Sequence, residues 1–125
     1  RSGNLEMVKT LLALGADPNQ GAAKRGNPLI YAAILGDQQI AQLLLDAGAD
    51  INAVVPRDET PLIKASRYGQ TEMVKFLVEK GARVNLGVRT SLGDNWEYRT
   101  PLNRATSSEI SNYVLSVGAS ELRRL

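Results

Sequence analysis

The chain has 125 residues, of which 43% are hydrophobic and 22% are charged, and its formal net charge at pH 7 is +2. This length and balance suit one folded domain. The sequence contains no cysteine and no histidine, which removes disulfides, thiolate nucleophiles, histidine bases and most zinc chemistry, so we expect no cofactor and no metal. A cysteine-free chain is compatible with either redox state, and the compartment stays open, with the cytoplasm favoured.

Short motifs recur along the chain at one period. Gly-Ala-Asp or a close variant begins at Gly15, Gly48 and Gly81, at intervals of 33 residues. A period of this length indicates stacked repeats, because one repeat cannot bury its apolar face alone. We predict an all-α solenoid of about three and a half helix-turn-helix repeats in a single domain. The domain is 1–125, with a half repeat at 1–19 and repeats at 20–52, 53–85 and 86–125.

The first 19 residues predict the second helix of an incomplete repeat. Met7, Leu11 and Leu12 are spaced as one face of a helix, and no first helix precedes them. We therefore expect the chain to be part of a longer protein. We also expect apolar surface at this end, either exposed or covered by self-association with a neighbouring chain.

The two complete repeats share one pattern, which is clearest in 53–85. Thr60 can cap a helix that starts at Pro61, where the missing N–H is not needed. Gly69 can end this helix in the left-handed conformation, and a second helix closes at Gly81 in the same way. The apolar stripe of the second helix predicts its buried side. The stripe consists of Met73, Val74, Leu77 and Val78.

The last repeat departs from the period. Matching the markers places about seven extra residues between Asn85 and Thr100 and removes about three between Ala105 and Ile110. We therefore predict one elongated turn before the last repeat, followed by a shortened first helix.

These motifs resemble the ankyrin repeat family. The matching residues are Thr60-Pro61-Leu62, Ala65, Gly69 and Gly81-Ala82, with Pro28-Leu29, Ala32-Ala33, Gly36 and Gly48-Ala49-Asp50 one repeat earlier. The resemblance implies a non-catalytic protein–protein interaction module whose turns and first helices form a concave partner-binding face. In the family, a histidine of the motif forms hydrogen bonds between adjacent turns. Its place is taken here by Ile30, Ile63 and Asn103, so adjacent turns must be held together by other bonds.

Candidate reactive groups are few. Asp94 and Glu97 could hold calcium, but the ligand spacing of a calcium loop is missing, which favours a solvated loop. The segment from Gly87 to Gly93 lacks the lysine of a phosphate loop. The serines near the C-terminal end have no histidine to activate them. They are Ser107, Ser108 and Ser111. We therefore predict that the chain is not an enzyme.

We expect a partner to contact residues of the turns and first helices. These are Arg57, Glu59, Arg67, Tyr68, Trp96, Tyr98 and Arg99. Tryptophan, tyrosine and arginine dominate binding energy when a partner buries them. The positive bias of this side favours an acidic protein or peptide, while interspersed carboxylates argue against nucleic acid. Asp58 and Glu59 are expected at a solvated turn tip. For Trp96 a second interpretation stays open, an anchor that covers the end of the stack.

A second class of function also stays open. The run from Asn95 to Leu102 looks like the ankyrin tails of some bacterial membrane metallopeptidases of the antirepressor-sensing kind. The chain would then be a regulatory or docking segment of a larger enzyme, whose zinc motif is not in this sequence. The longest apolar run, Leu29 to Leu35, is far too short for a membrane span, so no membrane insertion is expected.

Overall fold

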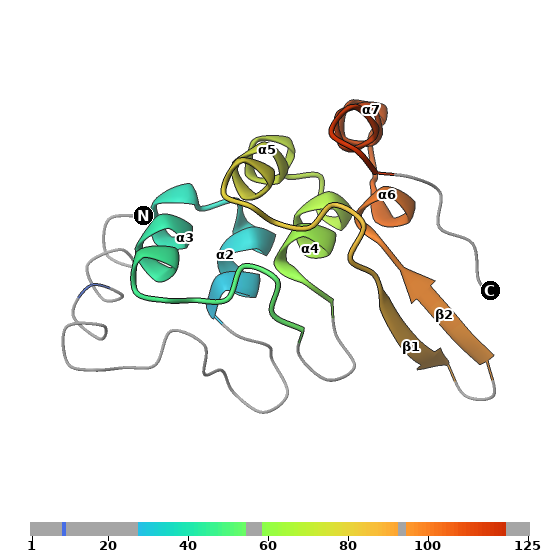
Figure 1. Ribbon diagram of the computed structural model, residues 1–125, viewed down its shortest axis with the longest axis horizontal. Coiled ribbons are helices and arrows are strands. Elements are labelled where there is room, and N and C mark those ends of the chain that lie inside the picture. The colour runs from blue at the N-terminus through green and yellow to red at the C-terminus, as the bar shows by residue number, and fades with distance from the viewer. Residues whose placement is uncertain (1–8, 10–27, 55–58, 93–94, 120–125) are drawn as a thin grey trace.

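The helices form two rows along the molecule, and a β-hairpin extends from one end (Figure 1). The inner row contains α2 (Pro28–Leu35), α4 (Pro61–Arg67) and α6 (Pro101–Arg104), and the outer row contains α3 (Gln38–Asp46), α5 (Thr71–Glu79) and α7 (Ser108–Ser116). The computed structural model describes residues 9, 28–54, 59–92 and 95–119, and at 90–92, 95 and 96 it describes the backbone alone. Of the predicted half repeat at 1–19 only Lys9 is described, so Met7, Leu11 and Leu12 lie outside the described residues.

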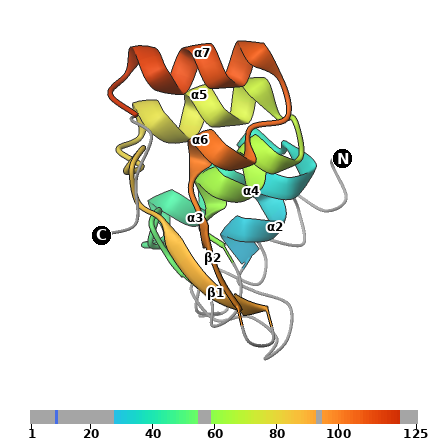
Figure 2. The same cartoon turned by 90° about the vertical axis from the view of Figure 1, so that its right-hand side faces the viewer.

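The elongated turn predicted before the last repeat forms a β-hairpin, a conformation that the repeat pattern does not predict. Strands β1 (Val88–Leu92) and β2 (Asn95–Arg99) pair antiparallel, with Val88 opposite Arg99 and Leu92 opposite Asn95. The strands contain several β-branched and aromatic residues, and the two residues that join them are Gly and Asp. The hairpin points away from the helical rows (Figure 2).

Side-chain caps and glycines set where the helices begin and end. The predicted cap of α4 is confirmed, because Thr60 Oγ1 accepts a hydrogen bond from the Ile63 amide at 3.1 Å and Pro61 is the first helical residue. Gly48 and Gly81 follow the outer-row helices at φ values of 102° and 103°. The sequence predicted left-handed glycines at both places, and this is confirmed. The shortened first helix of the last repeat is also confirmed, since α6 has four residues.

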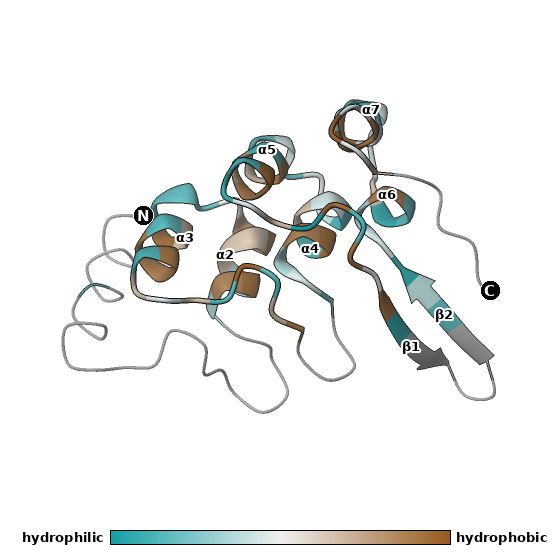
Figure 3. Cartoon of the chain, viewed as in Figure 1, coloured by the Kyte–Doolittle hydropathy of each residue, from teal (hydrophilic) through white to brown (hydrophobic). Residues whose placement is uncertain are grey.

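An aliphatic core fills the space between the two rows, where Figure 3 shows apolar colouring on the facing sides of the helices. The inner row contributes small alanines that let the rows approach closely. Every predicted residue of the α5 stripe faces this core, with Val78 partly buried and the others fully buried. The core includes Leu29, Ala32, Ala33, Ile40, Ala41, Leu44, Leu62, Ala65, Met73, Val74, Leu77, Ile110 and Val114.

Asparagine side chains join neighbouring repeats. Asn52 Oδ1 accepts a hydrogen bond from the Arg83 amide at 3.0 Å. One repeat later, Asn85 Nδ2 donates to the Gly118 carbonyl at 2.9 Å. These asparagines end the Gly-Ala motifs, so the recurring motif that marks the period also supplies bonds between repeats. The structure thus shows one way in which the turns are held without the histidine of the family motif.

Candidate functional site

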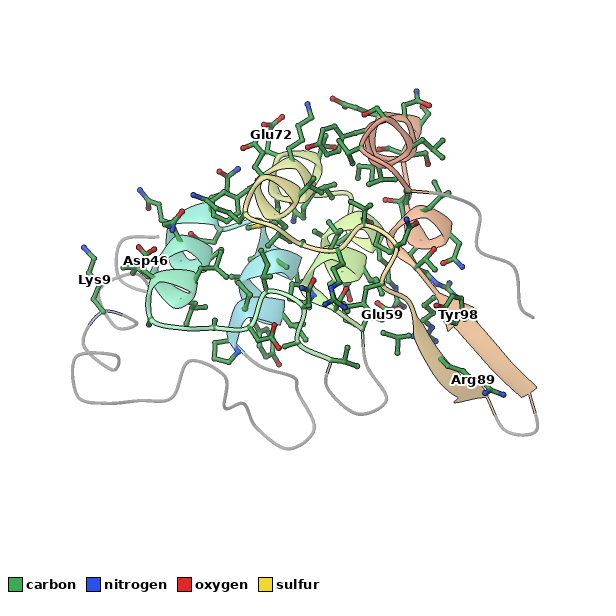
Figure 4. All side chains as sticks on the ribbon, in the orientation of Figure 1. Lys9, Asp46, Glu59, Glu72, Arg89 and Tyr98 are labelled. Atoms are coloured by element: carbon green, nitrogen blue, oxygen red, sulfur yellow. The ribbon has the colours of Figure 1, made fainter. Side chains whose placement is uncertain are left out.

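The most unusual side chain in the described chain is Glu59, which is completely buried at 0% exposure. Glu59 directly precedes Thr60, the N-cap residue of α4, and Figure 4 shows it between α4 and the hairpin. The expectation of a solvated turn tip is therefore wrong for Glu59, and Asp58 lies outside the described residues. A buried carboxylate is tolerated only where opposite charges or hydrogen bonds replace the lost water.

Three cationic side chains surround the Glu59 carboxylate. Arg99 Nη1 donates a hydrogen bond to Glu59 Oε2 at 3.1 Å. Arg67 Nη1 lies 3.5 Å from Oε1, and Lys64 Nζ lies 3.6 Å from the same oxygen. Glu59 Oε1 has no hydrogen bond, so it is stabilised by these two longer ion pairs. Two of the cations belong to α4 and the third to β2, so Glu59 joins the helix to the hairpin.

A second carboxylate, Glu97 on β2, continues the network towards α6. Arg99 Nε donates to Glu97 Oε1 at 2.7 Å, and Arg104 Nη2 pairs with Glu97 Oε2. The hydrogen bond from Arg99, followed by that from Arg104, lowers the pKa of Glu97 below its ordinary value. The bond to Glu97 likewise raises the pKa of Arg99. Glu97 is a weak candidate for a calcium ligand, because both of its carboxylate oxygens are bonded to guanidinium groups. Asp94, the other carboxylate of that candidate site, lies outside the described residues.

We call these six side chains the ion network; its members are Glu59, Lys64, Arg67, Glu97, Arg99 and Arg104. The network connects α4, β2 and α6. Arg104 Nε is buried without a hydrogen-bond partner in the described structure. A hydrogen bond from Asn103 Nδ2 to the Tyr98 carbonyl, at 2.8 Å, also joins α6 to the hairpin. The base of the hairpin is thus fixed to the inner row by charged and polar contacts.

Tyr68, the C-cap residue directly after α4, lies beside the network and is 51% exposed. Lys64 Nζ and Arg67 Cζ each lie 6.0 Å from the centre of its ring. This distance is at the outer limit of a cation–π contact. The result is an exposed aromatic ring with two cations next to it, both of which are also paired with Glu59.

Of the seven predicted site residues, the structure brings four together. Glu59, Arg67 and Arg99 are in direct contact, and Tyr68 contacts Arg67. Tyr98 is half-buried, and a Cβ atom added at Gly87 would lie 2.5 Å from its ring. The ring therefore packs over a glycine. For Trp96 only the backbone is described, opposite Ser91, and Arg57 lies outside the described residues.

The site prediction omitted two cations that belong to the network, Lys64 and Arg104. A signal for them was present in the repeats. Tyr31, Lys64 and Arg104 each lie three residues after the proline that begins their helix. Equivalent positions of successive repeats lie next to each other in a solenoid. Comparing these positions between repeats would have placed Lys64 and Arg104 on the same face as Arg67.

The outer row carries a smaller and more exposed set of charges. Lys75 on α5 lies 3.9 Å from Glu72 and 4.0 Å from Glu109. Its Nζ also lies 5.8 Å from the centre of the Tyr113 ring. Tyr113 and Phe76 are partly buried against the core, so both rings pack within the outer row. The exposed ion pairs of this row contribute little to stability.

Neither a metal site nor a membrane span is found in the described part of the chain. Among those residues, no three or more carboxylates or other metal-binding side chains come together. None of the helices described is long enough and apolar enough to cross a bilayer.

Comparison with protein families gives a match that covers nearly the whole chain. The family described as ankyrin repeats, in three copies, matches residues 1–88 and again residues 55–122. A search among curated proteins found no match. The two family matches overlap in the repeat formed by α4 and α5.

Proposed function

This chain belongs to the ankyrin repeat family, whose repeats are generally protein–protein interaction modules, and we propose that it binds a partner protein through its inner face. The inner face consists of the exposed or partly exposed side chains on one side of α2 and α4, namely Tyr31, Leu35, Lys64, Arg67 and Tyr68. The family is typically non-catalytic, so the proposed activity is binding.

The observation that carries this proposal is the exposed ring of Tyr68 beside Arg67. Tyr68 is 51% exposed, and the Arg67 side chain is 45% exposed. Tyrosine and arginine are enriched among residues that contribute most to binding when a partner desolvates them. An exposed tyrosine and arginine that lie side by side at the end of α4 can form the centre of such an interface.

Glu59 supports the proposal because it orients the cations before any partner arrives. Lys64 and Arg67 are both held near its buried carboxylate, at 3.6 and 3.5 Å. A long charged side chain that is already ordered loses less entropy when it binds. The buried carboxylate itself has no exposed surface, so we assign Glu59 a positioning role and not direct contact with the partner.

We assign the hairpin a secondary part in the interface. Trp96 and Tyr98 lie on β2, next to Arg99, which anchors the strand to Glu59. Trp96 is the only tryptophan, so its fluorescence reports on the hairpin alone. A partner that reaches the hairpin should shift this emission, and Trp96→Ala should then weaken binding about tenfold, as expected for an interface tryptophan. An emission already blue-shifted in the free protein would support the structural anchor instead.

Affinity capture from a native extract tests the proposal. The immobilised wild-type chain, the inner-face variant Arg67→Ala/Tyr68→Ala and the outer-row variant Lys75→Ala are compared, and bound proteins are identified by mass spectrometry. We expect at least one protein bound by the wild type and by Lys75→Ala to be lost with the inner-face variant. Equal melting temperatures of the three chains exclude unfolding as the cause. If the inner-face variant retains every protein that the wild type binds, the proposed face is wrong.

A further inference from the structure

The inner row changes chemically from one repeat to the next. Helix α2 carries no charged side chain, whereas α4 carries Lys64 and Arg67 and α6 carries Arg104. The large exposed side chains of α2 are apolar, with Tyr31 43% and Leu35 57% exposed. Figure 3 shows the same change, since α2 is mostly apolar in colour and α6 is partly hydrophilic.

These residues occupy equivalent positions and therefore form rows across the helices. Tyr31, Lys64 and Arg104 each lie three residues after the first proline of their helix. Leu35 and Tyr68 each lie seven residues after that proline. Helix α2 packs against α4, and α4 packs against α6. A partner segment that runs along the inner row of helices, from α2 to α6, thus passes from apolar groups on α2 to cations on α4 and α6.

The cationic end of this row has more positive than negative groups. Among its described members, the ion network holds four cations and two carboxylates. The side chains of Arg67 and Arg104 are 45% and 27% exposed, so a partner can reach both of them. A carboxylate brought in by a partner would add an acceptor to a group of guanidinium donors, which form strong charge-assisted hydrogen bonds.

We propose that the inner face binds an acidic peptide in extended conformation, with an apolar side chain against α2 and carboxylates against α4 and α6. Packed helices lie about 8–10 Å apart, and an extended chain advances about 3.3 Å per residue. About three residues therefore lead from one helix to the next. The peptide should carry an apolar residue with acidic residues about three and about six positions away. This proposal rests on the proposed function, because it uses the same face.

A random dodecapeptide display library, selected on the full chain, tests the proposal. We expect the selected peptides to be rich in aspartate and glutamate, with an apolar residue at the spacing given above. Their fluorescein-labelled forms should bind in anisotropy assays, and binding should weaken as salt increases. Selected peptides that are basic, or acidic peptides with no preferred position for an apolar residue, would overturn the proposal. So would a library that yields no binder, or tighter binding of a poly-uridine oligonucleotide.

Matched variants show whether the peptide lies on the inner face. Arg67→Gln should weaken the anisotropy signal about tenfold, the loss expected for one charge-assisted contact. Leu35→Ser should weaken it as well, because the apolar residue loses its contact, while Lys75→Gln on the outer row should not. Peptides that bind Leu35→Ser and the wild type equally would contradict the orientation of the peptide, which places its apolar residue against α2.

The failure of this proposal differs from the failure of the proposed function. If native partners depend on Arg67 and Tyr68 but no acidic peptide is selected, the inner face binds a folded surface of another chemistry. If acidic peptides are selected but Lys75→Gln abolishes their binding, the outer row is the site and both proposals are wrong. Sedimentation of the chain alone tests whether a second copy of the chain occupies the inner face. A dimer that Tyr68→Ala breaks would mean that this face binds a second copy.

Discussion

The repeat formed by α4 and α5 and the hairpin that follows it are stabilised in different ways. In the repeat, Leu62, Met73 and Leu77 are almost completely buried in an aliphatic core, and Thr60 caps the first helix. The hairpin is fixed at its base by the ion network, through Arg99 and the other charged groups around it. One region depends on apolar burial that recurs from repeat to repeat, and the other depends on a set of charges that the described part of the chain shows only at the last repeat.

The difference bears on the binding that we propose. Apolar burial is non-directional and tolerates change on the exposed surface, so the repeat can vary its outer side chains without losing the fold. Ion pairs hold particular groups at particular distances. The ion network therefore orients the cations next to the surface that we propose for binding, and it joins that surface to the hairpin.

The largest expected effect is in the repeat core. Leu77→Ala on α5 removes a side chain that is 0% exposed, and we expect a loss of about 2–5 kcal/mol in the free energy of unfolding from lost burial and the resulting cavity. Urea denaturation followed by circular dichroism measures it. The control Leu35→Ala, at a side chain that is 57% exposed, should change stability by less than about 0.5 kcal/mol. Similar losses for the two variants would mean that the assigned core is wrong.

The next effect concerns the buried carboxylate of the hairpin base. Glu59→Gln keeps the shape but removes the charge that balances Lys64, Arg67 and Arg99, and we expect a loss of about 2 kcal/mol. The control Glu109→Gln, at an exposed ion pair 4.0 Å from Lys75, should have almost no effect. Both are measured by urea denaturation. A Glu59→Gln chain as stable as the wild type would show that the network does not fix the hairpin.

A smaller effect is expected at the glycines, which differ between the two regions. Gly81 has a φ of 103°, and a Cβ atom there would have no neighbour within 4 Å. Gly81→Ala should therefore cost about 1 kcal/mol through backbone strain alone. Gly87→Ala instead places a Cβ atom 2.5 Å from the Tyr98 ring. Gly87→Ala should therefore shift Trp96 fluorescence, and Gly81→Ala should leave it unchanged. A shift with Gly81→Ala and none with Gly87→Ala would contradict the difference between the two glycines.

The smallest effect is the pH dependence of the hairpin. The pKa of Glu97 is lowered in the folded chain from its ordinary value of 4.5. The contribution of Glu97 to the stability of the folded chain is therefore present above that value and is lost as the pH falls through the folded pKa. Thermal unfolding monitored by Trp96 emission, at about pH 6 and about pH 3, measures this contribution. Glu97→Gln should show a smaller difference between the two pH values. An equal difference in both chains would assign the acid sensitivity to other carboxylates.

The sequence predicted the repeats well because their signals are periodic. The spacing of Gly48 and Gly81, the Thr60 cap and the apolar stripe of α5 each follow from local rules that one repeat shares with the next. The extra residues of the last repeat were found for the same reason, since they interrupt the period.

The sequence could not show the ion network, because it depends on contacts between distant residues. Glu59 and Arg99 are separated by 40 positions, and no local pattern states that a glutamate before a helix cap will be buried. A charged residue beside a turn is normally solvated, which is why the expectation for Glu59 was wrong. The hairpin was missed because an insertion defines a length and not a conformation. The alternation of residues along its two strands is the only local pattern that indicates strand pairing.

Binding through the inner face is the central claim, and a ¹H–¹⁵N NMR titration of the full chain with the tightest-binding acidic peptide tests it most directly. We predict that the amide signals of Tyr31, Leu35, Lys64, Arg67 and Tyr68 shift in a saturable way, while those of α3, α5 and α7 stay in place. Saturable shifts confined to the outer row, with the inner-row signals unchanged, would contradict the account.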